Sequence, residues 1–346
     1  MATQATRTVE DSADFLATII GEESQRGQRV QAGPILRLMV CAAESVAQRH
    51  CGCQAVLLGL DRIDLTRVIS HMDLVRFDAR LVDVGHSSMV VEVRASVQRP
   101  MEREFSPSHV GFITMVAVDG AGRPLRELPK LNYDTPLGAE AQALVEHRRA
   151  QLAERKQALE WIAARESLRP EDVIEPFQIE RYDYLTPQLT TVQVKRPASA
   201  RRDDGNVRIR AGDLLMWADQ VATYTAQRFA NNDQAVTISV NDIVFKRPMH
   251  RDEHIELFAQ VSYVRSHSLE VAVDIILHVP DGGTEFVASI DFLIFNYHRS
   301  GLKKKITTGL RFEPGDLAGM RRYLHARTRY NFWKSHPESH LTQSPD

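Results

Sequence analysis

The sequence contains one long segment twice, about 180 residues apart. AGPILRLMVCAAESVAQRH begins at Ala32 and AGDLLMWADQVATYTAQRF begins at Ala211, and the AQR triplet lies at the same distance from the AG pair in both. Further on, DRIDL (61–65) matches NDIVF (241–245), and DVGHSSMVVEV (83–93) matches YVRSHSLEVAV (263–273). Matches in the same order at a nearly constant offset predict two copies of one domain. A length of 346 residues, which is more than one core usually organises, agrees with this.

Each copy has the pattern of one helix followed by several strands. Gly33-Pro34 and Gly212-Asp213 suit a helix start, because proline is tolerated in the first turn and aspartate accepts its unpaired amides. Runs rich in β-branched and apolar residues then predict strands at 55–60, 74–81, 89–97 and 112–118, and at 236–240, 255–261, 269–277 and 286–295. We therefore predict an α+β fold in which an antiparallel sheet wraps a central helix, twice.

The domain boundaries follow from changes in composition. We predict an N-terminal domain at 1–135, a linker helix at 136–170, a C-terminal domain at 171–305 and a tail at 306–346. The linker is rich in Ala, Leu, Glu, Arg and Gln and begins at a proline, which is typical of an exposed, solvated spacer helix. The tail is predicted to contain a final helix near 314–327 and a polar, disordered end.

Composition excludes several classes of function. The net charge of −2 gives no reason to expect nucleic acid as a partner, and no stretch of the sequence is long and apolar enough to span a membrane. The first residues resemble neither a secretory signal nor a transit peptide. The three cysteines, Cys41, Cys51 and Cys53, lack the further ligands of a metal site and are expected to be reduced thiols of a cytoplasmic protein.

The second copy resembles the acyl-CoA thioesterases of the hotdog superfamily. The resemblance rests on GDLLMWADQVA at 212–222, VRSHSLEVAV at 264–273 and GFITMVAVDGAGRPLRELPKL at 111–131. The two copies and the charged linker are similar to the tandem, double-hotdog members of that family in particular, and the resemblance extends to about residue 300. It implies two hotdog domains, acyl-CoA as the substrate, hydrolysis of its thioester and no cofactor.

Comparison of the two copies singles out Asp219. One face of the second helix has Leu, Asp, Ala and Ala at 215, 219, 222 and 226, whereas the matching face of the first helix has Val40 in place of the aspartate. Burial of a carboxylate in an apolar stripe costs free energy, so its presence indicates a functional role. The alternative is an aspartate that only hydrogen-bonds a neighbouring loop.

The resemblance implies roles for residues around Asp219. Asp219 would act as general base on water, or as nucleophile, while the helix start near Gly33 of the other copy binds the carbonyl oxygen. Gln31 is the candidate for orienting water or thioester. The mirror site would pair Gly212 with Val40, which cannot do acid or base chemistry, so one competent site is expected; Glu44 is a weaker substitute there and more typical of a peripheral charge.

Two features of the sequence depart from the family pattern. Family members carry an asparagine shortly before the glycine pair, whereas Arg29 and Arg208 occupy these positions here and Asn206 lies two residues earlier. The polar partner of Asp219 is therefore open. The glycine pair itself is Ala-Gly in both copies.

Two serine-containing turns are candidates for contacts with the CoA moiety. The resemblance points to Ser87 and Ser88 in the first copy and to Arg265 and Ser268 in the second, where hydroxyl and guanidinium groups can bind phosphate. Gly212 and Asn206 complete the set of candidate substrate-binding residues. The alternative is an ordinary turn between strands. The lysine run at 303–305 is more typical of a solvated charged segment.

Two other functions remain open on the sequence alone. The first is a double-hotdog protein that binds or senses acyl-CoA without hydrolysing it. The second is a hydratase, which needs a histidine five residues after the aspartate, where this chain has Tyr224. A homo-oligomer is expected because hotdog pairs expose sheet edges, and the family favours a trimer of double hotdogs.

Overall fold

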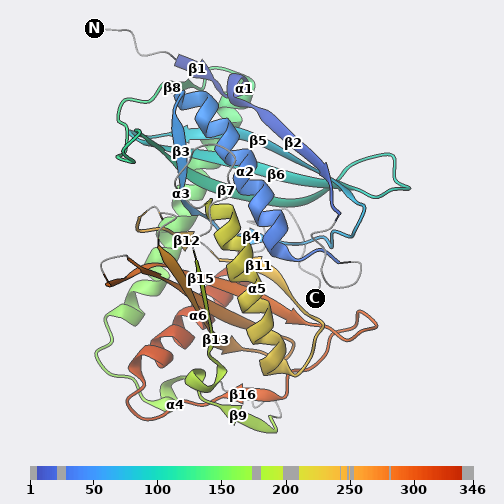
Figure 1. Cartoon of the computed structure of the whole chain (residues 1–346), viewed down its shortest axis with the longest axis vertical. Coiled ribbons are helices and arrows are strands. Elements are labelled where there is room, and N and C mark those ends of the chain that lie inside the picture. The colour runs from blue at the N-terminus through green and yellow to red at the C-terminus, as the bar shows by residue number, and fades with distance from the viewer. Residues whose placement is uncertain are drawn as a thin grey trace.

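The computed structural model describes residues 6–21, 29–173, 181–197, 210–241, 243–247, 249, 253–279 and 282–336. It contains two six-stranded antiparallel sheets, each wrapped around one helix (Figure 1). Both the α+β class and the pair of hotdog domains predicted from the sequence are confirmed.

The N-terminal sheet wraps helix α2 (Ala32–Cys51). Its strand order is β12-β3-β7-β6-β5-β2. The bounds are β2 Asp14–Ile19, β3 Gln54–Leu60, β5 Leu74–Val84, β6 Ser88–Gln98 and β7 Ser106–Val118. The four predicted strands are all found, and the edge strand β2 is an addition that sequence patterning missed. Side chains such as Met39, Phe77 and Ile113, fully buried, fill the space between helix and sheet.

The C-terminal sheet repeats this arrangement around helix α5 (Ala211–Ala230). Its strand order is β10-β13-β14-β15-β11-β4. The bounds are β10 Val192–Pro197, β11 Ala235–Val240, β13 His254–Val264, β14 Ser268–His278 and β15 Thr284–Asn296. The four strands predicted for this copy are found, and β10 is again an unpredicted edge strand.

Small elements complete the chain. Two short parallel pairs join β1 to β8 and β9 to β16. The remaining bounds are β1 Thr6–Thr8, β8 Lys130–Asn132, β9 Asp183–Leu185, β16 Thr308–Leu310, α1 Val9–Ser12, α4 Pro170–Val173 and a 3-10 turn, η1, at Pro187–Thr190.

The two copies exchange short strands. β4 (Ile63–Asp64) of the first copy pairs with β11 of the second, and β12 (Ile243–Val244) of the second copy pairs with β3 of the first. These strands lie within the repeated DRIDL and NDIVF motifs, so the motifs are crossover points. Each half thus completes the sheet of the other, and the two cores merge into one.

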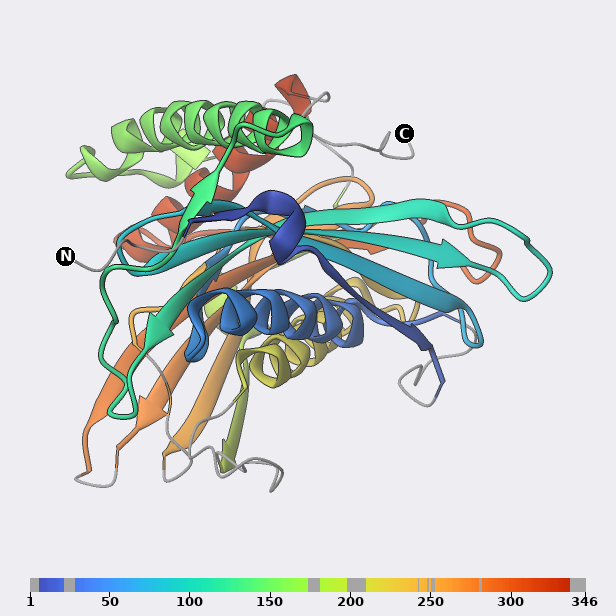
Figure 2. The same cartoon turned by 90° about the horizontal axis from the view of Figure 1, so that it is seen from above.

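Helices α2 and α5 lie side by side and approach at their glycines (Figure 2). A Cβ added to Gly33 would lie 2.8 Å from the Cα of Met216, and one added to Gly212 would lie 3.2 Å from the Cα of Arg37. The first distance is shorter than real Cβ contacts allow, so Gly33 is required for the helices to meet. The N-terminal turn of α2 is therefore held against the side of α5.

Helices α3 (Pro136–Ala163) and α6 (Leu317–Ser335) lie on the side of the sheets opposite to α2 and α5 (Figure 2). Ala141, Val145 and Ile162 of α3 are buried. The prediction of a solvated spacer was therefore wrong for one face of α3, because a narrow stripe of small apolar residues was hidden among many charges. The predicted tail helix is found as α6, eight residues longer than predicted at its end; residues 337–346 lie outside the described part.

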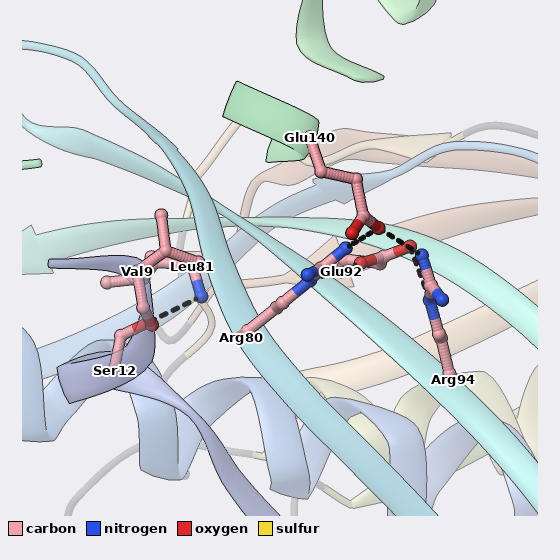
Figure 3. Close-up of polar contacts among 7 residues, drawn as sticks. All are labelled: Val9, Ser12, Arg80, Leu81, Glu92, Arg94 and Glu140. Atoms are coloured by element: carbon pink, nitrogen blue, oxygen red, sulfur yellow. Dashed lines mark hydrogen bonds and ion pairs between the residues drawn. The ribbon is translucent and has the colours of Figure 1, made fainter. Parts of the chain in front are cut away.

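Ion pairs tie α3 to the N-terminal sheet. Glu140 of α3 accepts hydrogen bonds from Arg80 at 2.6 Å and Arg94 at 3.2 Å, and both arginines also pair with Glu92, which is buried (Figure 3). Beside them, the hydroxyl of Ser12 in α1 accepts from the amide of Leu81 and donates to the carbonyl of Val9 (Figure 3). The covered Arg80 and Glu92, together with the half-exposed Arg94 and Glu140, link the first turns of α3 to strands β5 and β6.

The exchanged strand β12 offers a test of this fold. Ile243 is 1% exposed within the shared core, whereas the adjacent Val244 is 67% exposed. We expect Ile243→Ala to lower the free energy of unfolding by about 2–5 kcal/mol, since it opens a cavity, and Val244→Ala to cost less than about 0.5 kcal/mol. Urea unfolding followed by circular dichroism measures both. Equal, small effects would contradict the strand exchange.

Candidate active site

Asp219 lies at the contact between the two copies. It is 0% exposed, on the face of α5 that meets the start of α2. Its Oδ2 accepts a hydrogen bond from the amide of Gly33 at 2.8 Å, and its Oδ1 accepts one from the hydroxyl of Thr237 at 2.6 Å. The structure therefore brings Asp219 to the glycine of the opposite copy, the juxtaposition that the sequence predicted.

Burial changes the acidity of this carboxyl group. Loss of hydration raises the pKa of Asp219 from its ordinary value of 3.8 to about 6, although the hydrogen bonds from Thr237 and Gly33 favour the charged form. Asp219 is thus ionised at neutral pH yet close to the point at which it takes up a proton. A carboxylate of this kind accepts a proton more readily than an exposed one.

A cavity of about 560 Å³ is lined in part by Thr237, whose hydroxyl bonds the carboxylate, while Asp219 itself is not among its lining residues. Its wall includes the residues that lead into α2, the inner face of α5 and the start of β11, and several of its side chains are polar. The lining residues are Arg29, Val30, Gln31, Ala32, Thr223, Gln227, Asp233, Gln234, Ala235, Val236 and Thr237. The volume is in the range of small-molecule sites. Gln31, the candidate for orienting water or thioester, is one of the lining residues, and its side chain makes no capping bond to α2.

The partner left open by the sequence is Thr237. The hydroxyl of Thr237 bonds Asp219 and lies 3.3 Å from that of Thr223, so two hydroxyls link the carboxylate to the cavity wall. Thr237 lies at a β-bulge, where the register of β11 against β15 shifts between Thr237 and Ser239. A threonine in a strand is unremarkable in a sequence, and no helical spacing marks it, so sequence analysis missed it.

The corresponding positions of the first copy are apolar. Val40 stands where the second copy has Asp219, and Leu57 stands where it has Thr237; both are buried. The acid and its hydroxyl partner are therefore replaced together. Near this mirror position Asp213 instead faces Arg37 at 3.8 Å, beside Gly212. Glu44 accepts a hydrogen bond from Gln48 on its own helix.

Of the two predicted CoA-contacting turns, the β13–β14 turn is linked by ring contacts to the cavity residue Arg29. Arg265 and Ser268 close the β13–β14 turn through a backbone bond of 2.8 Å, and Ser268 is buried. In the same turn, the ring of His267 stacks on Phe295, which contacts Tyr297, and the guanidinium of the cavity residue Arg29 lies over Tyr297.

Of the predicted substrate-binding residues that the structure describes, none lines this cavity; these are Gly212, Ser87, Ser88, Arg265 and Ser268. Ser87 and Ser88 lie in the equivalent β5–β6 turn of the first copy and do not line it. Asn206 and Arg208 lie outside the described residues. Within the described ranges, no group of three His, Cys, Asp or Glu side chains has metal-binding spacing, and no helix is long and apolar enough to cross a membrane.

Comparison with known proteins places the chain in a family. A family model described as the thioesterase superfamily matches residues 211–278. An uncharacterized acyl-CoA thioester hydrolase of Zymomonas mobilis is 32% identical over 104 residues, which are 30% of this chain and 69% of that protein. The chain therefore belongs to the thioesterase superfamily, within the acyl-CoA thioesterase family that its sequence resembles.

Two further comparisons cover different shares of the chain. An uncharacterized acyl-CoA thioester hydrolase of Bacillus subtilis is 30% identical over 93 residues, which are 27% of this chain and 54% of that protein. The match thus spans about half of the relative. A solved structure from Lactobacillus plantarum, provisionally described as an oleoyl thioesterase, covers 82% of this chain and 96% of its own at 13% identity, with a TM-score of 0.50. At that identity the likeness concerns the fold alone.

The buried carboxyl predicts a pH-dependent stability. The folded protein holds a proton on Asp219 up to a pH of about 6, whereas the unfolded chain loses it near 3.8, so folding is progressively disfavoured as the pH rises between these values. We expect Asp219→Asn to stabilise the protein at pH 8 by about 3 kcal/mol, a gain that disappears near pH 4. Urea unfolding of both proteins across this range measures the difference. A difference that is constant with pH would contradict the burial of an ionised Asp219.

Proposed function

We propose that this protein hydrolyses the thioester of acyl-CoA to a free fatty acid and CoA, at a single site shared between the two hotdog domains. The observation that carries the proposal is the buried Asp219, bonded to the helix-start amide of Gly33 from the other domain and, on its other oxygen, to Thr237 in the wall of a cavity. Two relatives named as acyl-CoA thioester hydrolases support the substrate class.

The Gly33 amide is occupied by Asp219 itself, which bears on the order of events. A thioester carbonyl that enters the site would take over this N–H, with the positive end of the α2 dipole behind it. Asp219 would then lose one hydrogen bond and become a stronger base beside the carbonyl carbon. Binding of the thioester and activation of Asp219 would thus be a single step, in which the Gly33 N–H leaves the carboxylate and bonds the thioester carbonyl oxygen.

Two routes are compatible with this geometry. Asp219 can take a proton from water, whose oxygen attacks the carbonyl carbon, after which the tetrahedral oxyanion collapses and expels the CoA thiolate. Alternatively, Asp219 attacks the carbonyl itself, releases the thiolate and forms a mixed anhydride that water hydrolyses. In both, Thr237 orients the carboxylate and Gln31 is placed to hold water or the thioester. Neither route requires a cofactor.

The same proposal includes the remaining contacts and the assembly. Arg265 and Ser268 lie in a turn that is linked to the cavity residue Arg29 through three aromatic rings, which favours them over Ser87 and Ser88 as contacts for CoA. Gly212 would serve the mirror position rather than the reaction. We retain the trimer of double hotdogs as the proposed assembly and the cytoplasm as the proposed compartment.

One observation favours a second candidate, a protein that binds acyl-CoA without hydrolysing it. Both carboxylate oxygens of Asp219 are bonded and the group has no exposed surface, so hydrolysis requires the exchange described above. A hydratase finds less support, because Tyr224, at the position where a histidine is needed, is 49% exposed.

Substitution of Asp219 separates these candidates. We expect wild-type protein to release thiol from acyl-CoA and Asp219→Asn to lose at least about 1,000-fold in kcat, since both routes need the carboxylate. Asp213→Asn, which removes another carboxylate of α5, is the matched control and should retain activity. A thiol-trapping assay measures the rates, and calorimetry measures acyl-CoA binding. Binding without hydrolysis by wild type would identify the second candidate.

The Thr237 hydroxyl is expected to lower the pH at which activity is half-maximal on the acidic side of the pH profile, because it lowers the pKa of Asp219. Activity should rise with pH through about 6, as Asp219 loses its proton. Thr237→Val removes a hydrogen bond that favours the charged form, so the midpoint should move upward by about 1 pH unit, with a fall of about tenfold in kcat. Thr237→Ser retains the hydroxyl and should behave as wild type. An unchanged midpoint in the valine variant would contradict the role of Thr237.

A further inference from the structure

Helix α6 is connected through buried polar side chains to Asn241, the first residue of the second crossover motif. Arg329 of α6 donates to Glu270 at 2.5 Å and lies 3.0 Å from a carboxylate oxygen of Asp291. Glu270 in turn accepts a hydrogen bond from the side-chain amide of Asn241 at 3.1 Å. Asn241 directly follows β11, the strand of Thr237, so α6 reaches the end of that strand through two contacts.

The same network continues into the first copy. The side-chain oxygen of Asn241 accepts from Arg62 at 3.3 Å, and Arg62 also pairs with Asp64 at 2.7 Å. The guanidinium of Arg62 lies over the ring of Trp333, a second residue of α6, at 5.1 Å. The C-terminal helix therefore holds the exchanged strand β4 from two positions.

Strand β4 in turn fixes the bulge that aims Thr237. Asp64 pairs with Ser239, and the amide of Leu65 donates to the carbonyl of Ile238, the extra residue of the bulge, at 2.8 Å. A β-bulge redirects the side chains beside it, so the pairing of β4 decides where the hydroxyl of Thr237 points. A displacement of β4 would therefore weaken the hydrogen bond from Thr237 to the Asp219 carboxylate.

The network is buried well enough to hold one geometry. The side chains of Arg62 and Arg329 are each 12% exposed and that of Glu270 is 4% exposed. Charges that are removed from water interact strongly, and the loss of one partner leaves the others uncompensated. In the first copy, the equivalent crossover contains Asp61, which forms an ion pair with Arg148 of α3. The residue equivalent to Thr237 is Leu57, which has no hydroxyl to be oriented.

We propose that Arg329 is a positioning residue of the catalytic site: acting through Glu270, Asn241 and Arg62, it holds β4 against β11 and thereby directs the Thr237 hydroxyl to Asp219. The kinetic consequence rests on the proposed thioesterase function. The effect on Asp219 itself does not, because it is a property of the protein without substrate.

The test follows the protonation of Asp219 directly. Infrared difference spectra across pH 4–8 report the carbonyl stretch of its protonated carboxyl, identified as the band missing from Asp219→Asn. Arg329→Gln should move the midpoint of this band upward by about 0.5–1 pH unit, because a misplaced Thr237 stabilises the charged form less. Gly33 and Thr237 contact the carboxylate, Thr223 contacts Thr237, and Arg29 and Asp233 are the charged residues of the cavity that Thr237 lines. None of these is changed.

A control on the same helix separates positioning from general loss of stability. Arg322 of α6 forms a similar ion pair, with Asp274 at 2.7 Å, but it does not contact the crossover. Arg322→Gln should leave the midpoint unchanged, and Arg329→Lys should restore most of the wild-type value. In parallel, kcat should fall about 3–10-fold in Arg329→Gln with KM changed less than about twofold, since the substrate contacts are intact.

A double-variant cycle tests whether Arg329 acts through Thr237. In a Thr237→Val background, Arg329→Gln should cause no further shift of the Asp219 midpoint, because the hydroxyl to be positioned is already absent. Additive shifts, or equal shifts in Arg322→Gln and Arg329→Gln, would overturn the proposal. If wild type released no thiol while the midpoints behaved as expected, the thioesterase function would fail and the positioning role would stand.

Discussion

The hydrogen bond between the Gly33 amide and the Asp219 carboxylate is the interaction on which the site depends. It forms only because α2 and α5 approach so closely that any side chain at Gly33 would meet the backbone of Met216. A carboxylate so fully removed from water would otherwise lose its charge at neutral pH, and two donors keep it ionised without making it inert. The fold therefore supplies the close approach of two helices, and that approach brings the Gly33 amide to the carboxylate.

The two copies show how little must change for one fold to present different chemistry. Both copies have the same helix, the same strand order, a crossover strand and a helix-start glycine. In the second copy Asp219 and Thr237 are hydrogen-bonded, whereas the first copy has the buried apolar residues Val40 and Leu57 at these positions. Either polar group alone, placed in the apolar copy, would be buried without its partner. Acid and hydroxyl consequently form a pair that is favourable together and costly apart.

Sequence reasoning recovered the parts that depend on local pattern. The repeat predicted both hotdog units and eight strands, and the comparison of Leu-Asp-Ala-Ala with Leu-Val-Ala-Ala singled out Asp219, for which the family resemblance then supplied a role. The parts that depend on long-range pairing were missed. The direction of the Thr237 side chain depends on a β-bulge, in which the carbonyl of Ile238 accepts a hydrogen bond from Leu65 of the other copy. The buried apolar stripe of α3 was also missed, because it is narrow and the helix carries many charged residues.

The strand exchange also bears on how such a chain can change over evolutionary time. Strand β4 belongs to the first copy, which lacks the carboxylate, and it pairs with β11, the strand of Thr237. Deletion of the first copy, or its replacement by an unrelated domain, would therefore remove a strand from the sheet of the second copy. The copy without the acid still supplies the Gly33 amide and the strand beside Thr237, so the two copies are constrained to evolve as one unit.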